Sequence, residues 1–393
     1  MNCITLEPEL KLFTPGPTNI PNRVAQAAAM VNYHHRTASF SHVLRDTLEN
    51  MKPLFGTSGA ILPIHATGRG ALEGVYNNVF ARGDKVLSVA NGSFGEMAVK
   101  AMQKNGINSI ACFADWSANV DLDELEQMIL REKPVGLTAV WNDTSNGLVN
   151  PIRELGQLAR KYNLLFVVDT VSALGCMPFE FDNWGVDVAV VASQKGLMSA
   201  TGMSFAAVSD RAMQACASHP SHDFYINLPD IMKSVTEKYE TPGSTPVSIV
   251  LMVNEALHML QEEGLDHVFL RHRALSMGTK AALEALGCSL YPVGCKYRSD
   301  SLSVAKLPDG MSPADVVGRM QDGYGLLIGK GLKKTASENI RIAHMGYCYV
   351  QDMLQCITVL EAAFRDLGRE VAFGTGVAAF MQAYQAELQK AGQ

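Results

Sequence analysis

An unbroken apolar run at residues 188–192 is followed by a serine, a glutamine and then Lys195. A run with no polar residue on either face predicts a β-strand that is buried on both sides, as in a parallel sheet covered by helices. In open α/β sheets, ligands bind at the carboxyl ends of such strands. A lysine at this position is poorly placed as a solvated surface charge, so we expect its amine to serve a ligand.

A second buried strand is predicted at residues 164–169, and it ends in Asp169, 26 positions before Lys195. This separation is typical of neighbouring strands that are joined by a crossover. A lysine amine can bind an aldehyde, and a carboxylate can keep a pyridine nitrogen protonated. The pair therefore points to pyridoxal 5'-phosphate as the cofactor.

The composition fits an ordinary globular enzyme. Of the chain's residues, 47% are hydrophobic and 18% are charged. A length of 393 residues is enough for two or three domains with a large core. The net charge is -6, and no block of lysine and arginine is long enough to predict binding to nucleic acid or to a membrane surface. We expect small-molecule partners.

The eight cysteines are scattered, with no C-x-x-C motif and no His/Cys cluster at metal-binding spacing. In a chain of this size the pattern predicts reduced thiols of a cytoplasmic protein, and no metal site. The amino terminus lacks a basic region followed by an apolar core, and no apolar stretch is long enough to span a bilayer. We therefore expect a soluble, cytoplasmic protein.

Short apolar runs alternate with amphipathic stretches, a pattern that predicts an α/β fold. Helices are expected at residues 122–133 and 151–162, and from 247 to about 260. Strands are predicted at residues 60–65, 85–90, 107–113, 136–142, 164–169, 186–193 and 203–209. These seven strands should form one large, mostly parallel sheet.

The pattern changes near residue 265. A helix at 275–287, strands at 302–307, 325–328 and 340–344, and a terminal helix predict a smaller α+β domain packed against the large one. Residues 13–18 are too rich in turn formers for a helix or strand. We expect an N-terminal arm near the active site at residues 1–20, a large cofactor-binding domain at 21–260 and a small C-terminal domain at 261–393.

A glycine-rich segment at residues 65–73 follows the first predicted strand and opens a helix. Free backbone amides at a helix start bind a phosphate dianion, and Gly68 and Gly70 let the chain approach it closely. Taken alone, the segment fits a strand-to-helix turn without a ligand equally well. Its position in the same predicted sheet as Lys195 favours phosphate binding.

Eight short motifs follow one another along the chain, at residues 14–18, 35–36, 67–73, 90–95, 168–172, 193–196, 341–346 and 374–379. Their order and spacing, more than any one motif, resemble the class V, fold-type I pyridoxal-phosphate aminotransferases, particularly the serine-glyoxylate and alanine-glyoxylate branch.

The resemblance implies two catalytic residues. Lys195 would bind the cofactor aldehyde and, once released by the amino acid, would carry the proton between the substrate α-carbon and the cofactor. Asp169 would face the ring nitrogen. From the residues alone, Asp169 could instead cap a helix that follows the strand.

The resemblance also implies the cofactor-binding set. Phe94 and Val171 would lie on the two faces of the ring, and Thr144 would contact the ring oxygen or its neighbourhood. Asp143 or Thr144 could equally cap a turn that ends at Gly147. The phosphate would be held by Thr67, Gly68, Arg69 and Gln194.

Residues 241–247 match the segment that, in the family, reaches across a dimer interface to the partner's phosphate. Thr245 matches the family's threonine, whereas the tyrosine often found three positions earlier is Pro242 here. Either Ser244 or Thr245 is therefore the expected contact. The resemblance implies a homodimer with shared active sites.

Substrate binding is assigned by resemblance to Arg341, whose planar guanidinium can hold a carboxylate with two parallel hydrogen bonds. Gly16 would lie near the substrate. His344 could serve packing or catalysis equally well. Arg36 or Arg69 could recognise the second carboxylate of a donor such as aspartate.

The function that follows is an aminotransferase that passes an amino group from serine, alanine or aspartate to glyoxylate or pyruvate by a ping-pong mechanism. One alternative is a lyase of the same fold, such as a cysteine desulfurase, for which Cys348 is the nearest candidate nucleophile. Another is a non-catalytic binding protein. The presence of Lys195, Asp169 and Arg341 together argues against a non-catalytic binding protein.

Overall fold

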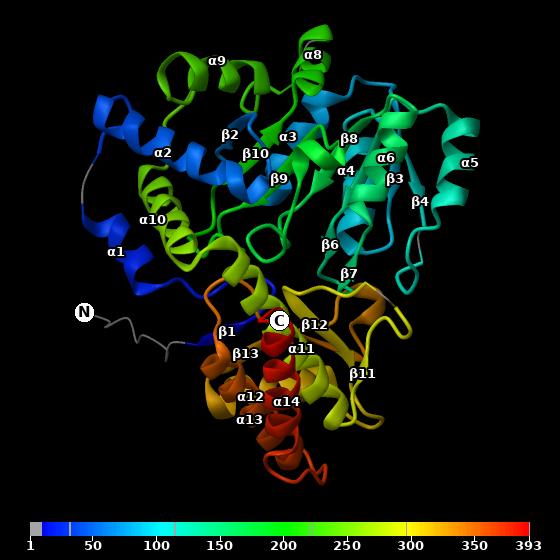
Figure 1. Ribbon diagram of the computed structural model, residues 1–393. Helices are drawn as coiled ribbons and strands as arrows, with labels where there is room; N and C mark the ends of the chain where they lie inside the picture. Colours follow the sequence, from blue (N-terminus) through cyan, green and yellow to red (C-terminus); the bar gives the residue numbers. More distant parts are fainter. Residues whose placement is uncertain are drawn as a thin grey trace, which may run out of the picture.

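The computed structural model describes residues 10–30, 33–113, 115–219, 221, 223–295 and 297–392. Figure 1 shows two β-sheets, each covered by helices, one above the other. The larger sheet has seven strands in the order β2-β10-β9-β8-β5-β3-β4. Its strands are β2 (Ala60–Ile64), β3 (Lys85–Val89), β4 (Asn108–Cys112), β5 (Gly136–Val140), β8 (Leu165–Asp169), β9 (Val188–Ala192) and β10 (Ser204–Val208).

The prediction of a mostly parallel seven-stranded sheet is confirmed. The five strands from β9 to β4 pair in parallel, whereas β10 runs antiparallel to both β9 and β2. β8 and β9 are direct neighbours. All five residues of β9 are buried, as expected for a strand covered by helices on both faces.

Some of the helices around this sheet begin at a residue whose side chain caps the helix, namely α2 (Ala38–Phe55), α5 (Leu122–Glu132), α8 (Asp210–Ser218) and α9 (Leu228–Lys238). The side chain of Asp121 accepts hydrogen bonds from two backbone amides at the start of α5. α6 (Ile152–Lys161) has an apolar stripe of Ile152, Leu155, Leu158 and Ala159, of which Leu158 is half-buried and the other three are buried. α10 (Val247–Glu263) continues three residues beyond the predicted end. The other helices here are α1 (Asn22–Met30), α3 (Gly68–Val79), α4 (Ser93–Lys104) and α7 (Phe181–Trp184).

The smaller sheet has five strands in the order β1-β13-β14-β12-β11. Its first strand comes from the N-terminal arm and pairs in parallel with β13, so residues of the arm are built into this sheet. The strands are β1 (Lys11–Phe13), β11 (Ser289–Leu290), β12 (Leu302–Lys306), β13 (Leu326–Lys330) and β14 (Asn339–Ala343).

Two predicted helices of this part are present, but one has a different start and the other is two helices. The helix expected at 275–287 is α11 (Leu265–Ala285), which begins ten residues earlier, directly after Gly264 at φ +83°. The single terminal helix is a pair, α13 (Val350–Asp366) and α14 (Thr375–Ala391), separated by a glycine-containing turn. The remaining elements are α12 (Pro313–Tyr324), a 3-10 turn at Lys333–Thr335 and the hairpin of β6 (Asn142–Asp143) and β7 (Leu148–Val149).

Each sheet has its own hydrophobic core, and the two cores meet near the start of β12 and the end of β14. Leu302, Val304 and Ala343 belong to the smaller sheet but pack in the core of the larger one. Within the described ranges, no helix has the length and apolar character needed to cross a membrane. The seven cysteines in these ranges are all free thiols.

Candidate active site

Lys195 lies in the turn that follows β9, as the sequence predicts. Its ammonium group donates a hydrogen bond to the backbone carbonyl of Pro15, so the N-terminal arm closes over it. Gly16 has φ +123°, and any Cβ at this position would collide with the Lys195 amine. Burial lowers the pKa of Lys195 to about 8, with Asp169 opposing the shift.

Asp169 ends β8 and is buried. Its Oδ1 accepts a hydrogen bond of 2.9 Å from the amide of Val171, which closes a turn. No helix follows at this point, so Asp169 is not a helix cap. Burial raises the pKa of Asp169 to about 6, while the Val171 amide and the nearby Lys195 favour the ionised form.

A cavity of about 190 Å³ lies at the carboxyl ends of β5, β8 and β9. The structure brings nine of the predicted cofactor-binding residues together around it: Thr67, Gly68, Arg69, Phe94, Thr144, Asp169, Val171, Gln194 and Lys195. Three further lining residues were not predicted, namely Val140, Asn142 and Ser172. All three lie at or just after the ends of predicted strands, and this position could have identified them from the sequence.

The start of α3 forms one wall of this cavity. Thr67 is the N-cap residue, and its side chain makes no capping hydrogen bond. Within the described ranges the amides of Gly68 and Arg69 also have no backbone acceptor. A Cβ at Gly68 would lie 2.9 Å from the Val171 side chain, so any larger residue here would displace Val171 from the cavity wall. The free amides and hydroxyl suit a phosphate dianion.

Asp143 fixes the position of Phe94 in the cavity wall. Its Oδ2 accepts hydrogen bonds from the amides of Phe94 at 2.8 Å and Gly95 at 3.2 Å, at the start of α4. Its Oδ1 accepts from the amide and hydroxyl of Ser145. The capping role therefore belongs to Asp143, and Thr144 is left to line the cavity.

The cavity wall contains polar atoms that lack a partner. Within the described ranges, the side-chain oxygens of Asn142 and Gln194 are buried without a hydrogen bond. Buried polar groups normally have partners, so these atoms indicate an occupant. The residues present fit pyridoxal phosphate: an amine for the aldehyde, a carboxylate for the ring nitrogen, Phe94 and Val171 for the ring, and a helix start for the phosphate.

Arg341 reaches the same site from the smaller sheet. It lies on β14, and its Nε donates to the carbonyl of Lys330 at 2.6 Å. Its Nη1 donates to the carbonyl of Thr144 at 3.1 Å, while its Nη2 has no partner within the described ranges. Burial lowers the pKa of Arg341 to about 10, so it stays charged at neutral pH. The charge of Arg341 also lowers the pKa of Lys195, because the two cations lie at one site.

Ser244 and Thr245 do not line this cavity. Thr245 is buried, and its hydroxyl lies 2.6 Å from that of Thr241, whereas Ser244 is exposed. Arg36 holds the same loop by donating to Glu240 at 2.7 Å and to the carbonyl of Thr241 at 2.7 Å. Arg36 is therefore engaged within its own chain.

His344 and Cys348 are both buried in the smaller sheet region. His344 Nε2 lies 3.1 Å from the hydroxyl of Ser303, and burial lowers its pKa well below the ordinary value. Cys348 packs in the core of the smaller sheet, and burial raises the pKa of its thiol. A mobile nucleophile needs an accessible thiolate, so Cys348 does not fit the lyase alternative.

Comparison with known proteins gives a consistent result. The family model described as aminotransferase class-V matches residues 11–338. The chain is 31% identical to the L-aspartate–glyoxylate aminotransferase of Paracoccus denitrificans, covering 95% of this chain and 96% of that protein. It is 32% identical to the serine–glyoxylate aminotransferase of Methylorubrum extorquens, covering 94% of each. A crystal structure of an alanine–glyoxylate aminotransferase from Nostoc sp. has a TM-score of 0.89 at 28% identity, over 93% of this chain and 98% of that chain.

Proposed function

Because the chain belongs to the class-V aminotransferase family, we propose that it transfers the amino group of serine, alanine or aspartate to glyoxylate or pyruvate by a ping-pong mechanism. The family makes it a pyridoxal-phosphate-dependent transaminase. When bound, the cofactor supplies an aldehyde that takes up the amino group and a ring that withdraws electrons from the substrate α-carbon. One observation carries the proposal: Lys195, Asp169 and Arg341 converge on a single site.

Lys195 is assigned the proton transfer at the substrate α-carbon. A pKa of about 8 leaves part of its amine unprotonated at neutral pH, so the same group can take up a proton and return it. The hydrogen bond to the Pro15 carbonyl holds the amine in place beside Gly16. Asp169, with a pKa of about 6, is mostly ionised at neutral pH and so can pair with a protonated ring nitrogen.

Arg341 is assigned the α-carboxylate of both substrates. A ping-pong enzyme binds the amino acid and the 2-oxo acid in turn at the same place, and the carboxylate is the group that they share. The unpartnered Nη2 of Arg341 in the described part of the chain and its charge near Lys195 support this role.

For a dicarboxylate donor, the second carboxylate is assigned to Arg69. Arg36 is committed to Glu240 and the adjacent loop, whereas the exposed guanidinium of Arg69 has no partner within the described ranges. Arg69 also lines the cavity, next to Phe94. The relative from Paracoccus denitrificans, by its name, uses L-aspartate.

The active unit is proposed to be a homodimer in the cytoplasm. The loop at residues 240–245 is held by Arg36 and by the pairing of Thr241 with Thr245, and Ser244 in this loop is exposed. Because the hydroxyl of Thr245 is already paired inside the loop, Ser244 is the better candidate for the partner's phosphate. The eight scattered cysteines of the sequence favour a reducing compartment.

The function is tested by mixing the holoenzyme with serine, alanine or aspartate in the absence of any acceptor. A ping-pong transaminase should release one equivalent of 2-oxo acid per active site and then stop until glyoxylate or pyruvate is added. Continuous product formation without an acceptor, or release of sulfide from cysteine, would instead indicate a lyase.

A matrix of the three donors against the two acceptors then tests the role of Arg69. Arg69→Gln should lower kcat/KM for aspartate by about tenfold or more relative to serine, because only aspartate has a second carboxylate. Arg36→Gln is the matched control and should leave the ratio between the donors unchanged. An inert aspartate in the unmodified enzyme would exclude the dicarboxylate assignment.

A further inference from the structure

The hairpin at residues 142–149 connects the two halves of the site. It follows β5 of the larger sheet, and it contacts the segment that precedes β12 as well as Arg341 on β14. The carbonyl of Gly147 accepts the amide of Ser299 at 3.0 Å, and that of Thr144 accepts Arg341 at 3.1 Å. The position of Arg341 relative to Lys195 therefore depends on how this hairpin holds the smaller sheet.

Asn142 is the side chain that belongs both to the cavity and to the contact between the sheets. It lines the cavity, and its Nδ2 donates to the hydroxyl of Ser301 at 2.8 Å and to that of Ser172 at 3.0 Å. The Ser172 hydroxyl donates in turn to the carbonyl of Asn142 at 2.7 Å. All three residues are buried, so a lost hydrogen bond would leave a polar group without water.

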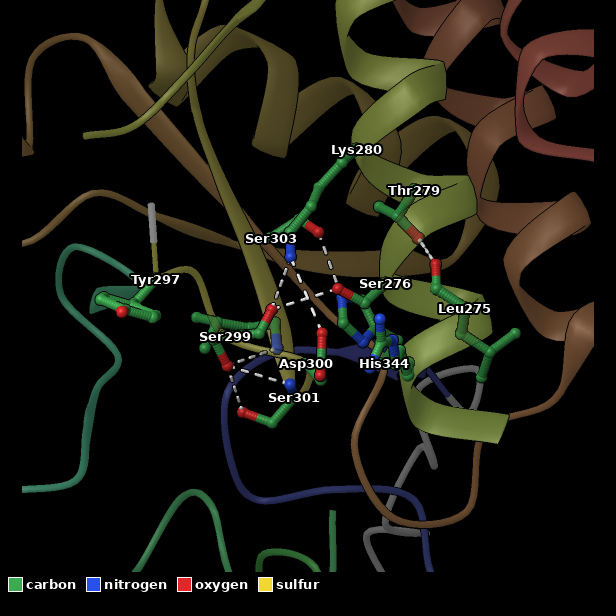
Figure 2. Close-up of polar contacts among 12 residues, drawn as sticks. Leu275, Ser276, Thr279, Lys280, Tyr297, Ser299, Asp300, Ser301, Ser303 and His344 are labelled. Carbon is green, nitrogen blue, oxygen red and sulfur yellow. Dashed lines mark hydrogen bonds and ion pairs between the residues drawn. The ribbon is translucent and has the colours of Figure 1, made fainter. Parts of the chain in front are cut away.

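Ser301 is held on its other side by the smaller sheet. It directly precedes β12, and its carbonyl accepts the amide of His344 at 3.0 Å, at the end of the strand that carries Arg341. Figure 2 shows Ser301 close to Ser299, and the two hydroxyls lie 2.9 Å apart. Ser301 therefore moves together with the end of β14.

The segment around Ser299 is anchored further by α11. Figure 2 shows Lys280 and Ser276 approaching it from this helix. Lys280 donates to the Ser299 carbonyl at 2.8 Å, and Ser276 donates to the same atom at 3.1 Å. With the segment fixed on this side, the hydrogen bond to Asn142 sets where the smaller sheet meets the cavity.

We propose that the hydrogen bond between Asn142 and Ser301 positions Arg341 for the substrate carboxylate, so that Ser301 controls substrate affinity without touching the substrate. The inference rests on the carboxylate-binding role proposed for Arg341. A guanidinium binds a carboxylate through two parallel hydrogen bonds, and these weaken when either group shifts by a fraction of an ångström. Loss of the link lets β14 shift relative to Lys195.

The experiment uses the holoenzymes of Ser301→Ala, Asn142→Ala and the double variant. The probe is the α-methyl derivative of the best donor, which binds but has no α-hydrogen to lose, and its dissociation constant is measured by calorimetry. Each single variant should bind the probe roughly tenfold more weakly. Since both substitutions break one link, the double variant should bind no more weakly than the weaker single variant.

Turnover provides an independent measurement. In Ser301→Ala, KM for the donor and KM for glyoxylate should rise by the same factor, with kcat within about twofold of the unmodified enzyme, because the carboxylate is common to both substrates. Asn142 lines the cavity itself, so the kcat comparison is confined to Ser301. Ser301→Thr, which keeps the hydroxyl, should restore the affinity.

Ser303→Ala is the matched control. Ser303 is a buried serine on β12, and its hydroxyl contacts His344 without crossing to the larger sheet. This variant should lose thermal stability like Ser301→Ala and keep its affinity for the probe. The inference is overturned by unchanged affinity in Ser301→Ala, by additive losses in the double variant or by an equal loss in Ser303→Ala. Absence of transamination in the unmodified holoenzyme would overturn the proposed function instead.

Discussion

The two halves of the site are held in different ways. Lys195 and Asp169 follow β9 and β8, which are adjacent strands with a fixed backbone register. Arg341 lies on β14 in the other sheet, and it reaches the cavity through contacts with the hairpin at residues 142–149. A backbone ladder holds its strands rigidly, whereas a contact between sheets depends on individual side chains. The half that performs the chemistry is therefore fixed locally, and the half that binds substrate is set by the interface.

The largest expected effect is at Lys195. Lys195→Ala should abolish turnover, because no other described residue that lines the cavity has an amine to carry the α-proton. Steady-state assays with the best donor and acceptor measure this. The fold should be unaffected, since the amine gives up a single hydrogen bond to the Pro15 carbonyl, and an unchanged melting curve of the apoenzyme is the control. A transamination rate equal to that of the unmodified enzyme would refute the central assignment.

Arg341→Ala tests the other half. Removing a partner of a bidentate carboxylate contact costs about 2–5 kcal/mol, so kcat/KM for the donor and for glyoxylate should both fall by roughly 30-fold or more. The proton transfer by Lys195 should still take place when the substrate is saturating. Arg341→Lys is the conservative control, and it should recover only part of the affinity because an ammonium makes no bidentate contact. Unchanged saturation by both substrates would remove Arg341 from its role.

Gly16→Ala tests how closely the N-terminal arm and Lys195 fit together. The added Cβ would collide with the Lys195 amine, so we expect turnover to fall about tenfold through displacement of the amine. Gly310→Ala is the matched control, since Gly310 also has a positive φ, +84°, but an added methyl group there would meet nothing within 4 Å. Both variants should lose roughly 1–3 kcal/mol of stability from backbone strain, and only Gly16→Ala should lose activity.

The smallest expected effect is on the titration of Lys195. The rate at which trace acetic anhydride acetylates Lys195 in the apoenzyme should rise about tenfold per pH unit below pH 8 and level off above pH 8. Only the neutral amine reacts, so the rate follows its titration. Asp169 raises this pKa, so Asp169→Asn should move the midpoint to lower pH. Arg341 lowers it, so Arg341→Ala should move the midpoint to higher pH. If the midpoint moved in the same direction in both variants, this would contradict the convergence of Asp169 and Arg341 on Lys195.

Much of the larger sheet could be predicted because its signals are local. A buried strand such as β9 is a continuous apolar run, and a cap such as Asp121 directly precedes its helix. The smaller sheet was predicted less well. The start of α11 was misplaced because the helical pattern is interrupted only by Gly264, which ends α10 and begins α11 at once. The division into domains at residues 20 and 260 stays a prediction, and β1 shows that the arm contributes to the smaller sheet.

The sequence alone determined that a lysine and an aspartate end two buried strands, because burial on both faces leaves a continuous apolar pattern in the chain. It also indicated the phosphate-binding helix start and the candidate arginine. Only the tertiary structure decided that Asp143 caps α4, that Arg36 is held by the loop at residues 240–245, and that Asn142 joins the cavity to Ser301. These roles depend on contacts between residues far apart in the chain, and the direction of a side chain across an interface leaves no periodic signal in the sequence.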